Sequence, residues 1–204
     1  SLGAFATETA SESPAPGGGS VAAYSATMGV ALATMVANLS AHKRGWDDRW
    51  EEFSAHAEQG LEFQNQLLRL VDADTQAFDA IMAAYGMPKA TEAQQAKRHQ
   101  AIQDATRNAI DIPMQVAQLA HDALNLAADM AKDGNPNSVT DAGVGAMCLR
   151  TAVLGAVLNA RINCGDLEDA DYVAQIQSRC AKLVESATRQ ESEILATVDR
   201  VMAG

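Results

Sequence analysis

The chain has 204 residues, of which 48% are hydrophobic and only 4% aromatic, and its formal net charge is −11 at pH 7. This acidic balance argues against nucleic acid or an anionic membrane surface as the main partner, because both require a basic binding surface. Abundant alanine with few aromatic residues is typical of closely packed helices, and the length fits one domain, although two small domains would also be compatible with it. We therefore predict an all-α, single-domain bundle of long, partly kinked helices over residues 1–204.

The cysteines and histidines form no metal-binding pattern. The three cysteines are odd in number and widely spaced, and the four histidines show no HxxxH spacing. We expect reduced thiols in or near the core, no metal site and no disulfide framework. We also expect no signal peptide and a cytoplasmic protein.

The first two predicted helices are separated by a loop rich in proline and glycine. A short helix covers residues 2–9, and the loop reads Pro14-Ala15-Pro16-Gly17-Gly18-Gly19-Ser20. Proline fixes φ and glycine permits close approaches, so the loop can present free N–H groups at a helix start, where they attract anions or electron-rich oxygens. A plain connector with Ser20 as helix cap is the competing interpretation.

The second predicted helix, over residues 19–41, is the expected central element. Large apolar residues recur at three- and four-residue steps on one face, and alanine and glycine occupy another, which indicates packing on both sides and close contact with a partner subunit. Polar residues interrupt the apolar stretch 21–39, so it is typical of a core helix rather than a membrane span.

Further helices follow along the rest of the chain. A helix or helix pair is predicted over 47–85, and a capping box of Thr91 and Gln94 starts a helix that runs to about residue 131 with a kink at Pro113. The sequence Gly134-Asn135-Pro136-Asn137 is a strong turn signal. Two last helices are predicted over 138–162 and 169–202.

Asp74 interrupts the apolar stripe of the helix predicted over 47–85. Its neighbours at helical spacing include Leu70, Ala77 and Phe78. A carboxylate there costs folding energy unless it is hydrogen-bonded, paired or in a polar pocket, and such a pocket suits proton transfer. An aspartate that ties down a neighbouring helix is an equally good interpretation. Asp72 points the opposite way and is predicted to be a solvated surface residue.

Three other charged residues have both a structural and a functional interpretation. Asp141 either completes a helix cap begun by Ser138 or enters a binding site. Arg150 and Arg161 project from nearly the same helix face, so they either hold a substrate carboxylate or form surface ion pairs.

Together these motifs resemble the formiminotransferase-cyclodeaminase family. The resemblance rests on the loop 14–20, the Val71-Asp72-Ala73-Asp74 segment with Ala77-Phe78, Met87-Pro88-Lys89, and the segment 134–141, which occur in this order over nearly the whole chain. It is a resemblance to the cyclodeaminase domain, which is also similar to certain stand-alone methenyltetrahydrofolate cyclohydrolases.

The resemblance implies an all-helical domain that dimerises through helix faces, with a folate site near the subunit interface. It implies cyclisation of 5-formiminotetrahydrofolate to 5,10-methenyltetrahydrofolate with release of ammonia, a lyase step of histidine degradation and one-carbon metabolism that needs no prosthetic group. In the family, the second aspartate of the segment that corresponds to 71–74 is catalytic, which implies that role for Asp74.

Residues of the loop, of the turn and of the basic set are expected to bind the folate. They are Pro16, Gly17, Gly18, Gly19 and Ser20; Asn135, Asn137, Ser138 and Asp141; and Lys43 and Arg161, with Arg44, Lys89 and Arg150 as further candidates for the anionic glutamate tail.

Two other functions remain open at this point. One is a methenyltetrahydrofolate cyclohydrolase, and the other is a non-catalytic helical dimerisation module. The best-known members of the family carry an N-terminal formiminotransferase domain, so a fused or separate transferase is an expected partner, and channelling of the intermediate stays open.

Overall fold

The computed structural model describes all of residues 1–204, and it is built from six α-helices and two short 3-10 turns, without strands. This confirms the predicted all-α class. The helices are α1 (Leu2–Thr9), α2 (Gly18–Ala41), α3 (Trp50–Tyr85), α4 (Glu92–Asp133), α5 (Val139–Asn163) and α6 (Ala170–Ala203), and the turns are η1 (Pro136–Ser138) and η2 (Cys164–Asp166).

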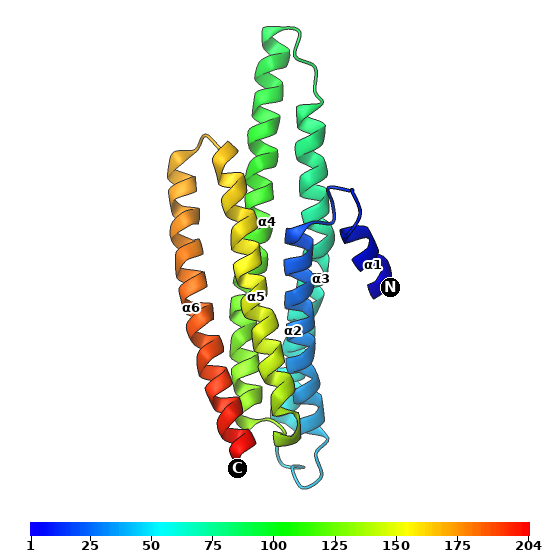
Figure 1. The fold of residues 1–204 in the computed structure, drawn as a ribbon, viewed down its shortest axis with the longest axis vertical. Helices are drawn as coiled ribbons and strands as arrows, with labels where there is room; N and C mark the ends of the chain where they lie inside the picture. Colours follow the sequence, from blue (N-terminus) through cyan, green and yellow to red (C-terminus); the bar gives the residue numbers. More distant parts are fainter.

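The helices form an elongated bundle around α2, α4 and α5 (Figure 1). Helix α2 packs against α3, α4 and α5, and α6 covers α4 and α5 on the other side. The ends of α3 and α4 extend beyond the other helices as a two-helix projection (Figure 1). The short α1 lies beside the start of α2, where the ring centroids of Phe5 and Tyr24 are 5.3 Å apart.

Glycine allows α2 and α5 to cross closely. A Cβ on Gly29 would lie 2.7 Å from the carbonyl oxygen of Gly145, and a Cβ on Gly145 would lie 2.8 Å from that of Gly29. Neither position has room for a side chain, so the two backbones pack directly against each other. The small-residue face predicted for the second helix is therefore the face that holds α5.

Most predicted helix boundaries agree with the structure. At the start of α4, the Oγ1 of Thr91 accepts a hydrogen bond from the N–H of Gln94, and Oε1 of Gln94 accepts one from the N–H of Thr91, as the capping box predicts. Residues 50–85 form one continuous helix rather than a pair, and Pro113 is buried inside α4.

Two predicted caps are wrong. Ser138 makes no side-chain cap, because residues 136–138 form η1, which leads directly into α5, and the Ser138–Asp141 capping motif is therefore not formed. Ser20 lies inside α2 and does not cap it, since the N-cap of α2 is Gly17. The hydroxyl of Ser20 is instead free to bind a residue of another helix.

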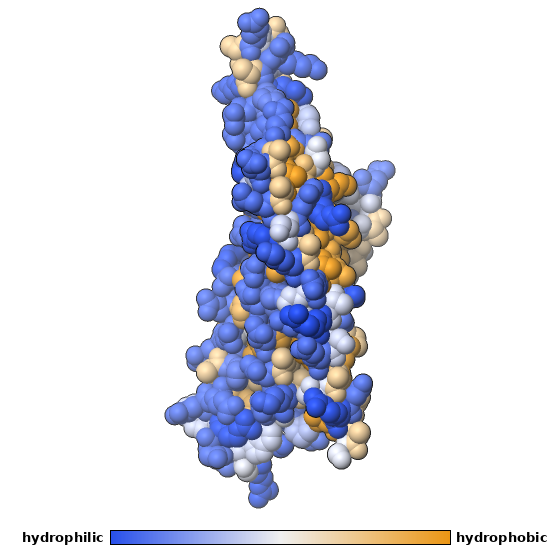
Figure 2. All heavy atoms as spheres, turned by 90° about the vertical axis from the view of Figure 1, so that its left-hand side faces the viewer, coloured by the Kyte–Doolittle hydropathy of each residue, from blue (hydrophilic) through white to orange (hydrophobic).

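One side of the bundle has an unpartnered apolar face, here named the α2–α5 face. It consists of exposed large hydrophobic residues of the two helices: Val21, Met28, Met35 and Leu39 of α2, and Val144, Met147, Leu158 and Ile162 of α5. Figure 2 shows that hydrophobic atoms gather in a band on one side of the upper half of the molecule, whereas most of the surface in that view is hydrophilic.

The same two helices are long and apolar enough to cross a membrane, by length and composition only. The candidate segments are Gly18–Ala41 and Pro136–Asp166, and 56% and 50% of their most apolar windows are buried inside the bundle. Core helices of soluble proteins pass the same test, which makes these segments weak evidence for a membrane span.

The three cysteines are unpaired and lie in or near the core, as predicted. Cys164 and Cys180 are buried, and Cys148 is partly buried. Burial raises the pKa of all three thiols above the ordinary value, so they remain protonated and weakly nucleophilic at neutral pH.

Candidate functional site

The glycine loop presents unpaired backbone donors at the start of α2. The first helical hydrogen bond runs from the N–H of Val21 to the carbonyl of Gly17 at 3.0 Å. The N–H groups of Gly18, Gly19 and Ser20 therefore precede the hydrogen-bond ladder and have no helical partner. They lie at the positive end of a 24-residue helix, as the loop sequence predicts.

Asp74 of α3 lies directly against this helix start. The hydroxyl of Ser20 donates to Oδ2 of Asp74 at 2.8 Å, and the hydroxyl of Thr75 is 3.4 Å from that of Ser20. A Cβ on Gly19 would overlap the Asp74 carboxylate, so the close approach requires glycine at this position. Asp74 thus has one oxygen anchored by Ser20, while its Oδ1 accepts no hydrogen bond from the chain.

A cavity of about 190 Å³ opens beside this carboxylate. The glycine loop lines one side, and Asp74, Phe78 and Ile81 of α3 line another. The third side consists of Asn159 and Asn163 of α5 together with Ala109 of α4. The cavity therefore combines a carboxylate, two carboxamides and the free amides of a helix start within apolar surroundings, as is typical of small-molecule sites.

The two asparagines were not predicted from the sequence. The side-chain amide of Asn159 donates to the carbonyl of Gly155 at 2.8 Å, and that of Asn163 donates to the carbonyl of Ala109 at 2.9 Å. A signal was present, since they lie four residues apart on one face of a helix composed mostly of small and apolar residues.

Several predicted folate-binding residues lie at the opposite end of α2, here called the base of the bundle. The base contains Lys43, which follows α2, and the turn between α4 and α5 with Asn135, Asn137, Ser138 and Asp141. Because α2 has 24 residues, the base and the Asp74 cavity are about 35 Å apart. Within one chain, the structure does not bring these residues to Asp74.

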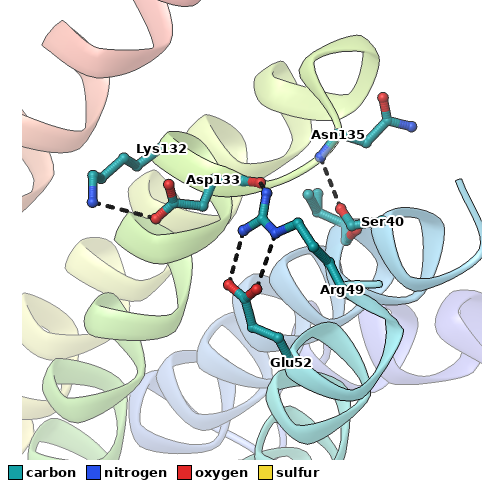
Figure 3. Close-up of polar contacts among 7 residues, drawn as sticks. Ser40, Arg49, Glu52, Lys132, Asp133 and Asn135 are labelled. Carbon is teal, nitrogen blue, oxygen red and sulfur yellow. Dashed lines mark hydrogen bonds and ion pairs between the residues drawn. The ribbon is translucent and has the colours of Figure 1, made fainter. Parts of the chain in front are cut away.

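Polar contacts hold the base together (Figure 3). The buried hydroxyl of Ser40 accepts a hydrogen bond from the N–H of Asn135 at 2.8 Å. Arg49 pairs with Glu52 at 2.8 Å, which lowers the pKa of that carboxyl, and it also reaches the carbonyl of Asp133 at 3.5 Å. These contacts fix the turn between α4 and α5 against the ends of α2 and α3.

The predicted basic residues also lie away from the cavity. Lys43 covers the ring of Trp46 at 3.7 Å from its centroid, and Lys89 is exposed at the tip of the α3–α4 projection, as Figure 1 shows for that connection. Arg150 pairs with Glu191 of α6 at 3.5 Å, so the surface ion-pair interpretation applies to it. Arg161 is exposed beside a hollow of about 540 Å³ between α5 and α6.

Pro16 and Asp72 both lie outside the lining of the cavity. Pro16 is half-buried next to the cavity-lining glycines but does not line the cavity itself. Asp72 is exposed on the outer side of α3, as predicted. No group of three or more His, Cys, Asp or Glu side chains is close enough to hold a metal ion.

Comparisons with known proteins identify the group to which this arrangement belongs. Residues 1–182 match the family described as formiminotransferase-cyclodeaminase. The chain is 35% identical over 193 residues to the methenyltetrahydrofolate cyclohydrolase of Methylorubrum extorquens, covering 93% of this chain and 91% of that protein. It is 33% identical over 199 residues to the formimidoyltransferase-cyclodeaminase of Rattus norvegicus, covering 98% of this chain but only 37% of the rat protein.

A solved structure has the same fold. The formiminotetrahydrofolate cyclodeaminase of Thermotoga maritima superposes with a TM-score of 0.79 and 27% sequence identity, and the match covers 100% of this chain and 96% of that one. By both sequence and fold, the chain belongs to the formiminotransferase-cyclodeaminase family, whose members here are folate-metabolising enzymes.

Proposed function

We propose that the Asp74 cavity binds 5-formiminotetrahydrofolate and converts it to 5,10-methenyltetrahydrofolate with release of ammonia. One observation carries this proposal: Ser20 holds the carboxylate of Asp74 at 2.8 Å, its Oδ1 accepts no hydrogen bond from the chain, and the residue lines a cavity. A positioned carboxyl group with one free oxygen is the arrangement that general acid–base catalysis needs.

The chemistry assigns Asp74 a proton transfer between two nitrogens. N10 of the folate attacks the carbon of the protonated formimino group on N5, and the C=N electron pair moves to nitrogen, so the tetrahedral adduct carries the former imine nitrogen as an amine and a protonated N10. Oδ1 of Asp74 accepts the proton from N10 and delivers it to this amine, which leaves as ammonia while the N5–C–N10 bridge becomes methenyl. The amides of Gly18 and Gly19 supply donors to electron-rich atoms of the substrate.

A second candidate function is hydrolysis of 5,10-methenyltetrahydrofolate. It is favoured by the similarity to the cyclohydrolase of Methylorubrum extorquens, because that match covers nearly all of both chains. Water would add to the methenyl carbon and lose one proton to Asp74. The bond between this carbon and N5 would then break as Asp74 returns that proton to N5, and the remaining hydroxyl proton would pass to solvent as the formyl C=O forms on N10.

Ammonia distinguishes the two reactions. The purified chain is supplied separately with 5-formiminotetrahydrofolate and with 5,10-methenyltetrahydrofolate, while methenyl absorbance and free ammonia are followed. Ammonia release with methenyl formation supports the deaminase, and accelerated loss of methenyl absorbance alone supports the hydrolase. If the protein catalyses neither reaction, the result supports a non-catalytic dimerisation module.

We further propose that the protein dimerises through the α2–α5 face. Helix α2 contains no charged residue, and its exposed residues Met28 and Met35 lie seven positions apart on the same side. On α5, Leu158 and Ile162 remain 66% and 76% exposed, although both are large and apolar. A second copy would bury this face in a bundle of four helices, two from each subunit.

Such a dimer would connect the two separated sets of predicted residues. If a two-fold axis crosses the middle of α2, the helices of the two subunits run antiparallel, and the base of one subunit lies beside the Asp74 cavity of the other. Lys43 and the turn at Asn135–Ser138 would then approach the substrate bound by the partner, and their cationic and polar groups would suit its glutamate tail.

Substitution in the face tests the dimer. Met28→Glu places a charge in the proposed interface, and sedimentation is expected to show a monomer, because burying an unpaired carboxylate is costly. Leu61→Glu is the matched control, since Leu61 is 52% exposed on α3 and lies outside this face. A dimer that persists in Met28→Glu, or that is lost equally in Leu61→Glu, would contradict the assignment.

Mixing experiments test the shared site. Asp74→Asn and Lys43→Ala subunits are each expected to have low activity, and their mixture should regain about a quarter of wild-type activity, because half of the random dimers contain one intact site. No recovery on mixing would show that Lys43 acts within its own subunit or not at all.

A further inference from the structure

We propose that Asn159 and Asn163 recognise the hydrogen-bond donor edge of the pteridine ring and so determine which pteridines the cavity accepts. This inference rests on the proposed folate function and adds to it the residues that select the ring. Both asparagines line the Asp74 cavity from α5, whereas Phe78 and Ile81 line it from α3.

The orientation of each carboxamide follows from its main-chain contact. The Nδ2 group of Asn159 lies 2.8 Å from the carbonyl of Gly155, and that of Asn163 lies 2.9 Å from the carbonyl of Ala109. Only the NH₂ side of a carboxamide can donate to a carbonyl, so these contacts fix the amide flip. Each side chain is left with Oδ1, an acceptor that makes no hydrogen bond within the chain.

The polar groups around the cavity therefore divide by type. The α5 side offers two neutral acceptors, Oδ1 of Asn159 and Oδ1 of Asn163, four residues and one helical turn apart. The start of α2 offers backbone donors, and α3 offers the Asp74 carboxylate together with the apolar Phe78 and Ile81. A flat ring with donors on one edge and apolar faces matches this division.

The 2-amino-4-oxopyrimidine part of a folate has such an edge. Its N3–H and its 2-amino group are adjacent donors, and two adjacent acceptors can bind them. A 4-amino ring has no hydrogen on N3 in its neutral form, so a lone pair of N3 would face an asparagine oxygen. A site that accepts a hydrogen bond from its ligand binds an analogue without that donor more weakly, because the acceptor of the protein is then left unpaired.

A purely structural role for the asparagines makes a different prediction. Asn163 ties α5 to α4 through Ala109, and Asn159 folds back onto its own helix. If these contacts serve packing alone, substitution changes stability and leaves ligand preference unchanged. Recognition of the ring instead predicts that substitution removes the preference between ligands while the protein remains folded.

The experiment compares two ligands that differ only at position 4 of the ring. Binding of 5-formyltetrahydrofolate and of its 4-amino counterpart is measured by calorimetry for the wild type and for Asn159→Ala and Asn163→Ala. Both ligands carry a formyl group in place of the formimino group, so no turnover is needed. Asn125→Ala is the matched control, because Asn125 is an exposed asparagine of α4 outside the cavity.

The wild type and the control are expected to prefer the 4-oxo ligand by about tenfold or more. Each cavity variant should bind both ligands with affinities within about threefold of each other while retaining wild-type helical content and a cooperative unfolding transition. Preference retained in both variants would overturn the inference, and so would a preference removed by Asp74→Asn instead, since Asp74 would then hold the donor edge.

Failure of the proposed function is distinguishable from failure of this inference. A wild-type protein that binds both ligands equally and still turns over a folate substrate keeps the function and overturns the role of the asparagines. A wild-type protein that binds neither ligand overturns both the proposed folate function and the role of the asparagines.

Discussion

The two ends of α2 are built from similar residues but use them differently. At its start, Ser20 binds Asp74, and polar groups of the loop, Asp74 and α5 remain without partners beside a cavity. At its end, Ser40 binds Asn135, and the surrounding polar groups are largely paired within the chain. Serine and glycine thus form part of the candidate site at one end and a paired turn at the other, and the difference lies in which hydrogen-bonding groups remain free.

The largest expected effect is at the start of α2, from Asp74→Asn. Removing the acid–base group should lower kcat by about two to four orders of magnitude, whereas folding and folate binding persist. Asp72→Asn is the matched control, since Asp72 is exposed on the same helix and should retain wild-type turnover. Steady-state ammonia release measures both variants.

Near wild-type kcat in a folded Asp74→Asn protein would remove Asp74 from the mechanism. An equal loss in Asp72→Asn would show that the charge of α3, rather than one positioned carboxyl group, supports turnover.

A smaller but still large effect is expected from Gly19→Ala. The new Cβ would occupy the place of the Asp74 carboxylate, which must then move, and displacement of a catalytic group by about 1 Å costs about a hundredfold in turnover. Gly3→Ala is the control, because Gly3 lies in α1 outside the cavity and a Cβ there meets no atom within 4 Å. The contrast between the two glycine variants in kcat is the measurement, and equal values would show that the close approach at Gly19 is unimportant.

At the base, Ser40→Ala should change stability rather than chemistry. The N–H of Asn135 would lose its acceptor, so the free energy of unfolding should fall by about 1–3 kcal/mol, measured by urea denaturation. With saturating substrate, kcat should stay within about threefold of wild type. Ser192→Ala, on the exposed side of α6, should change neither quantity. A large fall in kcat with unchanged stability would reverse the comparison between the two ends.

The smallest effect is expected at the start of α6, where the polar groups are again paired. The N–H of Tyr172, followed by Arg107, lowers the pKa of Asp169 below its ordinary value. Because the folded state favours the ionised form, this stabilisation is present above the unfolded-state pKa of about 4 and is lost as pH falls through the lower folded-state value. The effect is small because both partners are exposed and screened by salt.

Asp169→Asn keeps the helix cap but removes the charge. The urea midpoint of the wild type should therefore fall slightly more than that of the variant between pH 5 and the acid limit of folding, and turnover at neutral pH should be unchanged. Identical acid dependence of the two midpoints would show that ionisation of Asp169 contributes nothing to stability.

Much of the fold could be predicted because its signals are local. Apolar spacing and the glycine and proline breaks located the helices, and the interrupted stripe identified Asp74 as unusual before any contact was known. The free amides of the loop likewise followed from its sequence, since they depend only on where α2 begins.

The remaining features depend on how the helices pack, which no local pattern contains. Ser20 looked like a cap because its bond to Asp74 joins residues 54 positions apart. Asn159 and Asn163 face the cavity only because α5 lies beside both the loop and α4. The separation of Lys43 from Asp74 follows from the straight course of α2, which a list of motifs in chain order does not show.

A crystal structure of the protein with 5-formyltetrahydrofolate tests the central claim most directly. We expect the pteridine ring to lie in the cavity between the glycine loop and α5, with the N5 substituent beside Oδ1 of Asp74. A pteridine ring bound elsewhere, such as in the hollow of about 310 Å³ between α4 and α6, with the Asp74 cavity empty, would contradict the account.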